Sequence, residues 1–304
     1  MNAKLLTALG LLAVAPGQAR NASAQSEPTQ SEPAQQRPKA TSVCADDAGW
    51  DDPAEPFHIH GNTWFVGTCG ITAILVTSPQ GHVLIDGAAS QGSALISANV
   101  AKLGFRMADV RAMLLSHAHM DHAGGFAGLQ RLTTAPVWSR GSDAKALQRG
   151  RGGADDPQVN SAPPFAPVAN VRTLRDGAAV RVGPVTVRAV ATPGHTPGGT
   201  SWTWRSCEGQ SCIAITYVDS LSAISDEGFR FSASPARVAQ FQATIARVAA
   251  LPCDLLLTPH PGASGMWERL GPAAREPAIN PGACQALSAG ARERLADRLA
   301  REAR

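Results

Sequence analysis

Residues 116–122 read Ser-His-Ala-His-Met-Asp-His, and this stretch decides how the sequence is interpreted. It follows directly on the apolar run 112–115, which is typical of a short buried strand. His117 and His119 are two residues apart, so in an extended segment their imidazoles point the same way. Asp121 and the histidine after it follow once the chain turns into a helix. One short segment therefore offers two imidazoles to one metal ion, and a carboxylate and an imidazole to a second.

Three further apolar runs also end in residues that bind metals or substrates. The run 185–190 leads into His195, framed as Thr-Pro-Gly-His-Thr-Pro-Gly, and the run 255–257 leads into His260, framed by prolines. The run 213–218 ends in Asp-Ser-Leu-Ser. In layered α/β folds the carboxyl ends of strands share one edge, where sites are built from loops. We therefore expect His195 and His260 each to complete a set of three protein ligands, in loops that the flanking Pro and Gly hold rigid.

Three protein ligands around each ion, with one position left open, is the pattern of catalytic rather than structural zinc. Two zinc ions about 3.5–4 Å apart share a water whose pKa falls to roughly 7, so hydroxide is available at neutral pH. The sequence thus predicts a metal-dependent hydrolase in which this hydroxide attacks a carbonyl group. Asp121, as a ligand of the second zinc, is expected to orient the hydroxide. His58, His60 and His82 have no partner motif and are interpreted as ordinary histidines.

The apolar runs and turns on either side of this stretch predict a layered α/β fold. Composition is even from Val43 to the C-terminus, so residues 43–304 are predicted to form a single domain. Residues 150–168, rich in Gly, Pro, Asp and Ala, are predicted to be one long loop. Strands are expected at 63–67, 71–77, 82–86, 110–115, 178–190, 200–205, 213–218 and 255–257, and helices at 91–103, 124–132, 235–250 and 285–302.

Composition and charge exclude several classes of protein. Of the 304 residues, 17% are charged and 44% are hydrophobic, which fits a globular chain with a sizeable core and excludes disorder throughout or a coiled coil. Leaving out Lys4 and Arg20, which lie in a predicted signal peptide, 25 basic residues face 24 acidic ones, a net charge of +1. A net charge so close to zero, with no run of basic residues, argues against nucleic acid or an anionic membrane as the main partner.

The N-terminal residues have the features of an export signal. Lys4 supplies a positive start, residues 5–15 are apolar but too short to span a bilayer, and Ala22-Ser23-Ala24 offers a small-residue cleavage site. We therefore expect a signal peptide over 1–24 and a flexible polar leader over 25–42. The mature protein is expected to be secreted or periplasmic.

Six cysteines in an exported chain suggest disulfides, although six allow 15 connectivities. Cys207 and Cys212 flank a turn-like stretch between two predicted strands, which favours a disulfide across a hairpin. No pair has the CxxC spacing of a zinc knuckle or a redox site. The cysteines are therefore interpreted as structural.

With these residues in place, the chain resembles the metallo-β-lactamase superfamily, whose signature is the HxHxDH pattern of residues 117–122. It is most similar to subclass B3 of the metallo-β-lactamases, and within that subclass to the AIM-type enzymes, over nearly all of 43–304. The cysteine-ligand subclass would carry a thiolate near Ser220, where this chain has serine. The likeness rests on Gly67-Thr68-Cys69-Gly70, 117–125, 192–202, 219–222 and 258–261.

The resemblance implies a particular set of ligands and contacts. The first zinc would be bound by His117, His119 and His195. The second would be bound by Asp121, His122 and His260. By analogy Ser220 and Ser222 would bind the carboxylate of the substrate, directly or through water, and Gln158 would touch the substrate from the loop beside the groove. Asp86, which ends the run 83–85, would hydrogen-bond the ligand loop or cap its own turn.

The resemblance also implies the fold and the substrates. It implies an αββα sandwich with the site at the strand-end edge, and hydrolysis of the β-lactam ring of penicillins, cephalosporins and carbapenems, giving antibiotic resistance. The implied cofactors are two Zn²⁺ ions. A monomer is expected, because no heptad or apolar helix stripe is left exposed. The implied disulfides are Cys44–Cys69, Cys207–Cys212 and Cys253–Cys284.

Two alternatives remain open at this point. A glyoxalase II-like thiolester hydrolase or a lactonase of the same fold stays possible through Asp219, because those enzymes use an aspartate in that neighbourhood as a bridging ligand. The signal peptide, the context of 219–222 and the likeness along the whole chain argue against it. The other alternative is a periplasmic zinc binder that keeps the ligands without turnover, which a rate assay distinguishes.

Overall fold

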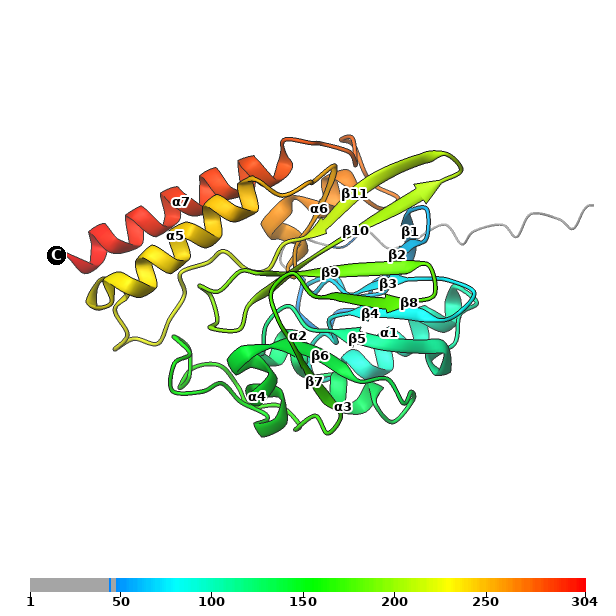
Figure 1. Cartoon of the computed structure of the whole chain (residues 1–304), viewed down its shortest axis with the longest axis horizontal. Coiled ribbons are helices and arrows are strands. Elements are labelled where there is room, and N and C mark those ends of the chain that lie inside the picture. Colours follow the sequence, from blue (N-terminus) through cyan, green and yellow to red (C-terminus); the bar gives the residue numbers. More distant parts are fainter. Residues whose placement is uncertain (1–43, 45–47) are drawn as a thin grey trace, which may run out of the picture. The chain divides into compact units, whose positions relative to one another are not determined.

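The structure, a computed structural model, describes Cys44 and residues 48–304. The predicted signal peptide 1–24 and leader 25–42 lie outside the described residues. In the described part, two β-sheets pack face to face and helices cover the outer face of each sheet (Figure 1). This arrangement confirms the predicted αββα sandwich.

The first sheet consists, in spatial order, of β1 (Phe57–His60), β2 (Thr63–Phe65), β3 (Ile74–Val76), β4 (His82–Ile85), β5 (Val110–Leu114), β6 (Val137–Arg140) and β7 (Val171–Leu174). The strands from β1 to β4 pair antiparallel, whereas β4 to β7 run parallel. The carboxyl ends of β4 and β5 therefore lie at the same edge of the sheet.

The second sheet consists, in spatial order, of β12 (Leu255–Leu257), β11 (Ser211–Tyr217), β10 (Thr200–Glu208), β9 (Val185–Ala191) and β8 (Ala179–Val182). Its neighbours pair antiparallel except β11 and β12, which are parallel. Gly183 and Gly209, with φ of +54° and +59°, form the tight turns of its two hairpins. Strands β9, β11 and β12 thus all end at one edge.

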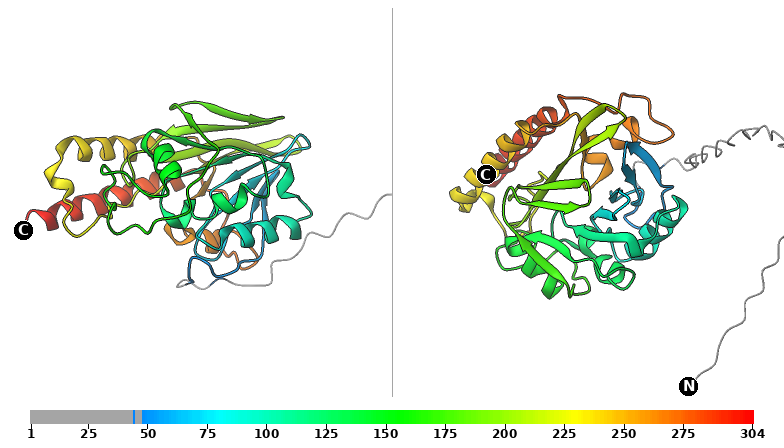
Figure 2. Two further views of the ribbon diagram at one scale, coloured as in Figure 1. Left: turned by 90° about the horizontal axis from the view of Figure 1, so that it is seen from below. Right: turned by 45° about the vertical axis from the view of Figure 1, so that its right-hand side comes forward.

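Helices α1 (Gly92–Lys102), α3 (Phe126–Leu129) and α4 (Gly141–Arg149) cover the first sheet, and α5 (Pro235–Ala249) and α7 (Ala283–Glu302) cover the second (Figures 1 and 2). Shorter elements are η1 (Met107–Asp109), α2 (Met120–Ala123), η2 (Phe231–Ala233), η3 (Pro261–Ser264) and α6 (Met266–Arg269). None of the helices in the described part of the chain combines the length and apolar character that crossing a bilayer needs.

The alternation of side chains along the strands builds the layers of the core. In β3, Ile74 and Val76 face the space between the sheets, whereas Leu75 faces the helices outside. Trp202 is fully buried in the layer between the sheets. Phe241 of α5 belongs to a third apolar layer, beneath α5 and α7. Because β3 is buried on both faces, it reads as a continuous apolar run.

All three implied disulfides are present. Cys207 and Cys212 face each other across the hairpin of β10 and β11, as the spacing alone suggests. Cys253, just before β12, is bonded to Cys284 in α7, which attaches that helix to the second sheet. The third bond joins Cys44 to Cys69.

Several elements differ from the sequence expectations. The expected strand 178–190 is the hairpin of β8 and β9, and the expected helix 124–132 is reduced to α3. The sequence patterns do not predict strands β1, β6 and β7 or helix α4. Strand β7 is a sheet edge with two of its four residues exposed, so it lacks the apolar run that marks a buried strand.

Candidate metal centre

Four strand ends meet at one edge of the sandwich, as the sequence predicts. Strand β5 leads into 116–122, and β9, β11 and β12 lead into His195, the pair Ser220 and Ser222, and His260. A backbone hydrogen bond of 2.8 Å from the start of β10 to the start of 116–122 ties the two sheets together at this edge. The loops that carry the predicted ligands are therefore supported by both sheets.

His117, His119 and His195 form the first group. Their candidate ligand nitrogens all lie within 4.8 Å of one another. The ring centroids are 4.6 Å apart for His117 and His195, 4.9 Å for His119 and His195, and 5.0 Å for His117 and His119. All three residues are buried. Three imidazoles gathered in this way suit a single zinc ion with an open fourth position.

Asp121, His122 and His260 form the second group. Oδ2 of Asp121 lies 3.1 Å from Nε2 of both His122 and His260, and these two nitrogens are 3.3 Å apart. A tetrahedral zinc ion with bonds of about 2.0–2.1 Å has ligand atoms about 3.3 Å apart, so these three atoms have the spacing of one face of such a site. The side chain of His260 is 39% exposed, so this group opens to solvent on that side.

Hydrogen bonds from outside the first group fix how its rings are turned. Nδ1 of His117 lies 2.8 Å from Oδ1 of the buried Asp219, and Nε2 of His119 lies 3.1 Å from Oδ2 of the buried Asp156. Nδ1 of His195 lies 3.0 Å from a backbone carbonyl in the loop after β11. Each of these nitrogens carries the proton if its ring binds a metal, so the opposite nitrogen is left as a ligand.

Burial and neighbouring charges set the protonation of the ligands. Burial lowers the pKa of His195 to about 3 and holds the pKa of His117 well below its usual range, and the surrounding histidines act in the same direction. Both imidazoles are therefore neutral at pH 7, as a metal ligand must be. Burial alone would raise the pKa of Asp121, but the adjacent His122 outweighs it and keeps this carboxyl ionised.

Asp86 ties the end of β4 to the ligand loop. Its carboxylate accepts hydrogen bonds from the backbone N–H and the hydroxyl of Ser116, at 2.7 and 2.6 Å, and from the hydroxyl of Tyr217 at 2.7 Å. Oδ2 also lies 3.6 Å from Nδ1 of His122. The predicted hydrogen bond between Asp86 and the ligand loop is thus confirmed, with Asp86 as the acceptor.

Asp143, at the start of α4, joins the two loops of the first group. Its buried carboxylate accepts hydrogen bonds from Ala118 N at 3.0 Å, from the hydroxyl of Thr196 at 2.7 Å, and from Gly198 N at 2.9 Å. Burial raises the pKa of Asp143 to about 6 although all three donors favour the carboxylate. Glycine at 198 permits this approach, because a Cβ there would lie 2.5 Å from the carboxylate carbon.

The predicted substrate-binding residues also lie at this edge. Nε2 of Gln158 is 3.4 Å from Nδ1 of His119 and 3.5 Å from Nε2 of His195, so its amide faces the first group directly. The hydroxyls of Ser220 and Ser222 are 2.8 Å apart, and that of Ser222 is 3.1 Å from Nδ1 of His195. Their roles toward substrate stay predictions, but the fold brings all three residues to the first group.

Sequence reasoning missed Asp143 and Asp156. Asp156 lies two residues before Gln158 in the predicted loop 150–168, and its only sequence signal was that proximity. Asp143 begins a helix that was not expected, and no local pattern links it to a histidine. Both contacts join segments that the sequence alone does not bring together.

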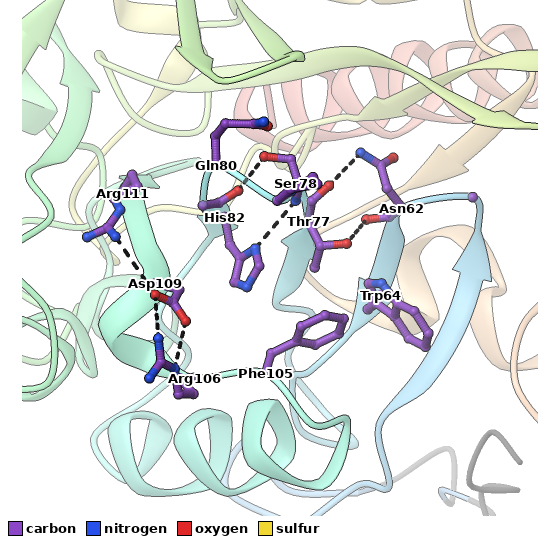
Figure 3. A pocket seen from close by; sticks show the side chains of 13 residues that line it. Asn62, Trp64, Thr77, Ser78, Gln80, His82, Phe105, Arg106, Asp109 and Arg111 are labelled. Atoms are coloured by element: carbon purple, nitrogen blue, oxygen red, sulfur yellow. Dashed lines mark hydrogen bonds and ion pairs between the residues drawn. The ribbon is translucent and has the colours of Figure 1, made fainter. Parts of the chain in front are cut away.

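A cavity of about 660 Å³ lies away from the two ligand groups and is lined by none of their residues (Figure 3). It is lined by the turn before β4 and by residues before β5, which are the amino ends of those strands. In it, Asp109 is paired with Arg106 at 2.8 Å, and His82 belongs to no cluster of three metal-type side chains in the described part of the chain. Choosing the functional site by cavity volume alone would therefore miss the two ligand groups.

Several known proteins that resemble this chain in sequence and structure are metallo-β-lactamases. A family model described as the metallo-β-lactamase superfamily matches residues 66–208. Among solved structures, the Rm3 metallo-β-lactamase is 46% identical, with 84% of this chain and 97% of that chain covered and a TM-score of 0.81. MIM-1 from Novosphingobium pentaromativorans is 46% identical, with 86% and 96% covered and a TM-score of 0.82. MEM-A1, a subclass B3 metallo-β-lactamase from a soil metagenome library, is 44% identical, with 84% and 99% covered and a TM-score of 0.80.

Fold, ligand groups and relatives together define a member of the metallo-β-lactamase superfamily. Within that superfamily, the chain belongs to the subclass B3 metallo-β-lactamases. It is therefore a metal-dependent hydrolase, and the resemblance to the superfamily and to its subclass B3 is confirmed.

Proposed function

We propose that the protein is a dizinc hydrolase that opens the β-lactam ring of penicillins, cephalosporins and carbapenems and so gives antibiotic resistance. The observation that carries this proposal is the pair of three-residue ligand groups, joined by the stretch 116–122, at the edge of a subclass B3 fold. His117 lies within 4.8 Å of donor atoms of both groups, so two ions held there would be close neighbours.

The residues fit two zinc ions in kind and in arrangement. Five imidazoles and one carboxylate are ligands that zinc takes in catalytic sites. Without an ion, the crowded ligand nitrogens of the first group would face one another in a buried space with no donor between them other than the amide of Gln158. The hydrogen bonds on the outer nitrogens of His117, His119 and His195 leave their inner nitrogens free to bind.

Zinc at these positions supplies a Lewis acid and a water that is acidic enough to act as the nucleophile at neutral pH. The chain's own residues position that chemistry. We assign Asp121 the catalytic role of orienting the nucleophile, because its carboxylate is ionised and lies at the junction of the two groups. Asp156 and Asp219 hold His119 and His117 in the orientation needed for ligation.

Ser220 and Ser222 are assigned to the substrate carboxylate. If Nε2 of His195 were to bind an ion, its Nδ1–H would donate a hydrogen bond to the backbone carbonyl of Ser222, 3.0 Å away. The hydroxyl of Ser222 can then donate to Ser220 at 2.8 Å, which leaves the Ser220 hydroxyl hydrogen free to donate to an anion. Gln158, across the first group, is assigned a contact to the substrate on its other side.

The geometry gives no support to a thiolester hydrolase or lactonase. That alternative depends on Asp219 as a bridging ligand between the ions. Oδ1 of Asp219 instead lies 2.8 Å from Nδ1 of His117, behind the ring and away from its ligand nitrogen.

The test is hydrolysis of a carbapenem and a cephalosporin by the purified protein, with and without a zinc chelator, alongside a metal count. We expect fast turnover that chelation removes and zinc restores, and two zinc ions per chain. Asp121→Ala and His119→Ala should abolish turnover while the fold is kept, and His58→Ala, outside both groups, is the matched control. Folded protein that opens neither ring, or that keeps full activity without metal, would overturn the proposal.

We also propose that the protein acts in the periplasm as a monomer. The three disulfides, which persist in oxidising compartments, support export. Light scattering on the purified protein and fractionation of a Gram-negative host that expresses it test these two points. A dimer in solution, or activity confined to the cytoplasm, would contradict them.

A further inference from the structure

A pocket of about 330 Å³ adjoins the second ligand group on the side of helix α7. Ser220, Ser222 and His260 line its inner side, and Leu287 and Arg294 of α7 line its outer side. The pocket therefore lies between the residues assigned to the substrate carboxylate and a helix that supplies none of the six proposed metal ligands.

Arg294 is the only lysine or arginine that lines this pocket. In the described part of the chain its guanidinium has no carboxylate partner, in contrast to Arg298 one turn later, which is bonded to Glu302. The one carboxylate that lines the pocket, that of Asp219, is buried, lies 2.8 Å from Nδ1 of His117 through Oδ1, and forms no ion pair with Arg294. The pocket thus contains a positive charge that no side chain in it neutralises.

The sequence of α7 makes room for this guanidinium. Nη1 of Arg294 lies 3.0 Å from the place where a Cβ at position 290 would be, so the side chain folds back over Gly290. Glycine inside a helix costs roughly 1 kcal/mol relative to alanine. Residues 287, 290 and 294 follow the three- and four-residue spacing of one helix face, which is the face turned to the pocket.

We propose that Arg294 binds the carboxylate beside the lactam ring of the substrate, together with Ser220 and Ser222, and so selects anionic substrates. This inference rests on the proposed function. A guanidinium presents paired N–H donors that match a carboxylate, whereas the Ser220 hydroxyl, oriented by Ser222, supplies a single hydrogen bond without charge. Because Arg294 is exposed, its contribution to binding is moderate. Because the substrate carboxylate keeps its charge while the ring opens, that contribution is the same in the ground state and the transition state.

The test compares an anionic cephalosporin with its methyl ester in Arg294→Ala, Arg294→Lys and Arg294→Glu. We expect KM for the acid to rise about 3- to 10-fold in Arg294→Ala, and further in Arg294→Glu, with kcat nearly unchanged. Arg294→Lys should keep part of the effect. KM for the ester should not change in any of them. Added salt should raise KM for the acid in the wild type more than in Arg294→Ala.

Arg292→Ala is the matched control, because Arg292 is exposed on the same helix, does not line the pocket and carries the same charge. Wild-type protein that opens neither compound would overturn the proposed function and this inference with it. An active wild type whose KM for the acid is unchanged in Arg294→Ala and Arg294→Glu would overturn this inference alone. Equal changes for acid and ester, or an equal change in Arg292→Ala, would also overturn it.

Discussion

Replacing Asp143 by alanine tests how the two loops of the first ligand group are held together. The three buried donors that this carboxylate accepts from, at 2.7 to 3.0 Å, would lose their acceptor. At about 1–3 kcal/mol for each of the three unsatisfied donors, the loss is about 3–9 kcal/mol. Burial raises the Asp143 pKa from 3.8 to about 6, which corresponds to about 3 kcal/mol that the folded protein spends on holding this charge. We therefore expect a net loss of about 0–6 kcal/mol in the free energy of unfolding, centred near 3 kcal/mol.

A second effect should fall on zinc binding. Asp143 fixes the loop of His117 and His119 relative to the loop of His195, and loss of such a positioning contact costs about 10- to 100-fold in metal affinity or activity. Asp143→Asn is the matched variant: it keeps the shape and one acceptor oxygen, but its amide must face one backbone N–H. We expect it to be more stable than Asp143→Ala and still weakened in zinc binding. Thr196→Val removes a single donor and should have a smaller effect on both.

Urea unfolding of the metal-free protein gives the stability, and competition with a chromophoric chelator gives the zinc affinity. Asp143→Ala protein that is destabilised but binds zinc as tightly as the wild type would refute the positioning argument. The pH dependence supplies a second check. Because the folded pKa of Asp143 lies above its unfolded value, its contribution is fully present below about pH 4 and is lost as pH rises through 6. The stability difference between wild type and Asp143→Asn should shift by up to about 3 kcal/mol over that window, to the disadvantage of the wild type at higher pH.

Three further predictions concern the surroundings of the site. Asp226 accepts four hydrogen bonds from the loop 150–168. Asp226→Ala should therefore raise KM in steady-state kinetics, with little change in the melting temperature measured by thermal unfolding. An unchanged KM would contradict this prediction. Burial would raise the pKa of Glu302, but hydrogen bonds from the backbone of η2 and from Arg298 outweigh it and lower this pKa to about 2. Allowing for screening by solvent, about 1–2 kcal/mol of stability should therefore be lost as pH falls from 4.5 to 2. Acid unfolding of Glu302→Gln should lack this pH dependence. Gly198→Ala would put a Cβ 2.5 Å from the carboxylate carbon of Asp143, and should weaken zinc binding as Asp143→Asn does; wild-type zinc affinity would show that the loop gives way without cost.

The sequence predicted the strand ends that carry the ligands because those signals are local. Strands β5 and β12 are short, mostly apolar runs, and a predicted metal ligand follows the end of each within three residues, so one pattern marks both the element and the site. Strand β1, by contrast, reads Phe-His-Ile-His with three of its four residues half-buried, and nothing in it separates a strand from a loop. Helix α4 has a buried face of only a few small residues and leucine, which the periodicity around it does not distinguish.

The residues that position the ligands could not be found in this way, because their partners are far along the chain. Asp143 is 25 residues from Ala118, Asp156 is 37 from His119, and Asp219 is 102 from His117. A metal ligand needs a fixed spacing to its neighbours in a strand or turn, which leaves a motif. A carboxylate that hydrogen-bonds the outer nitrogen of a histidine needs only to reach it in space, so any loop can supply it. We therefore expect that replacing such a carboxylate by alanine weakens zinc binding only in part, whereas replacing a ligand abolishes zinc binding in its group.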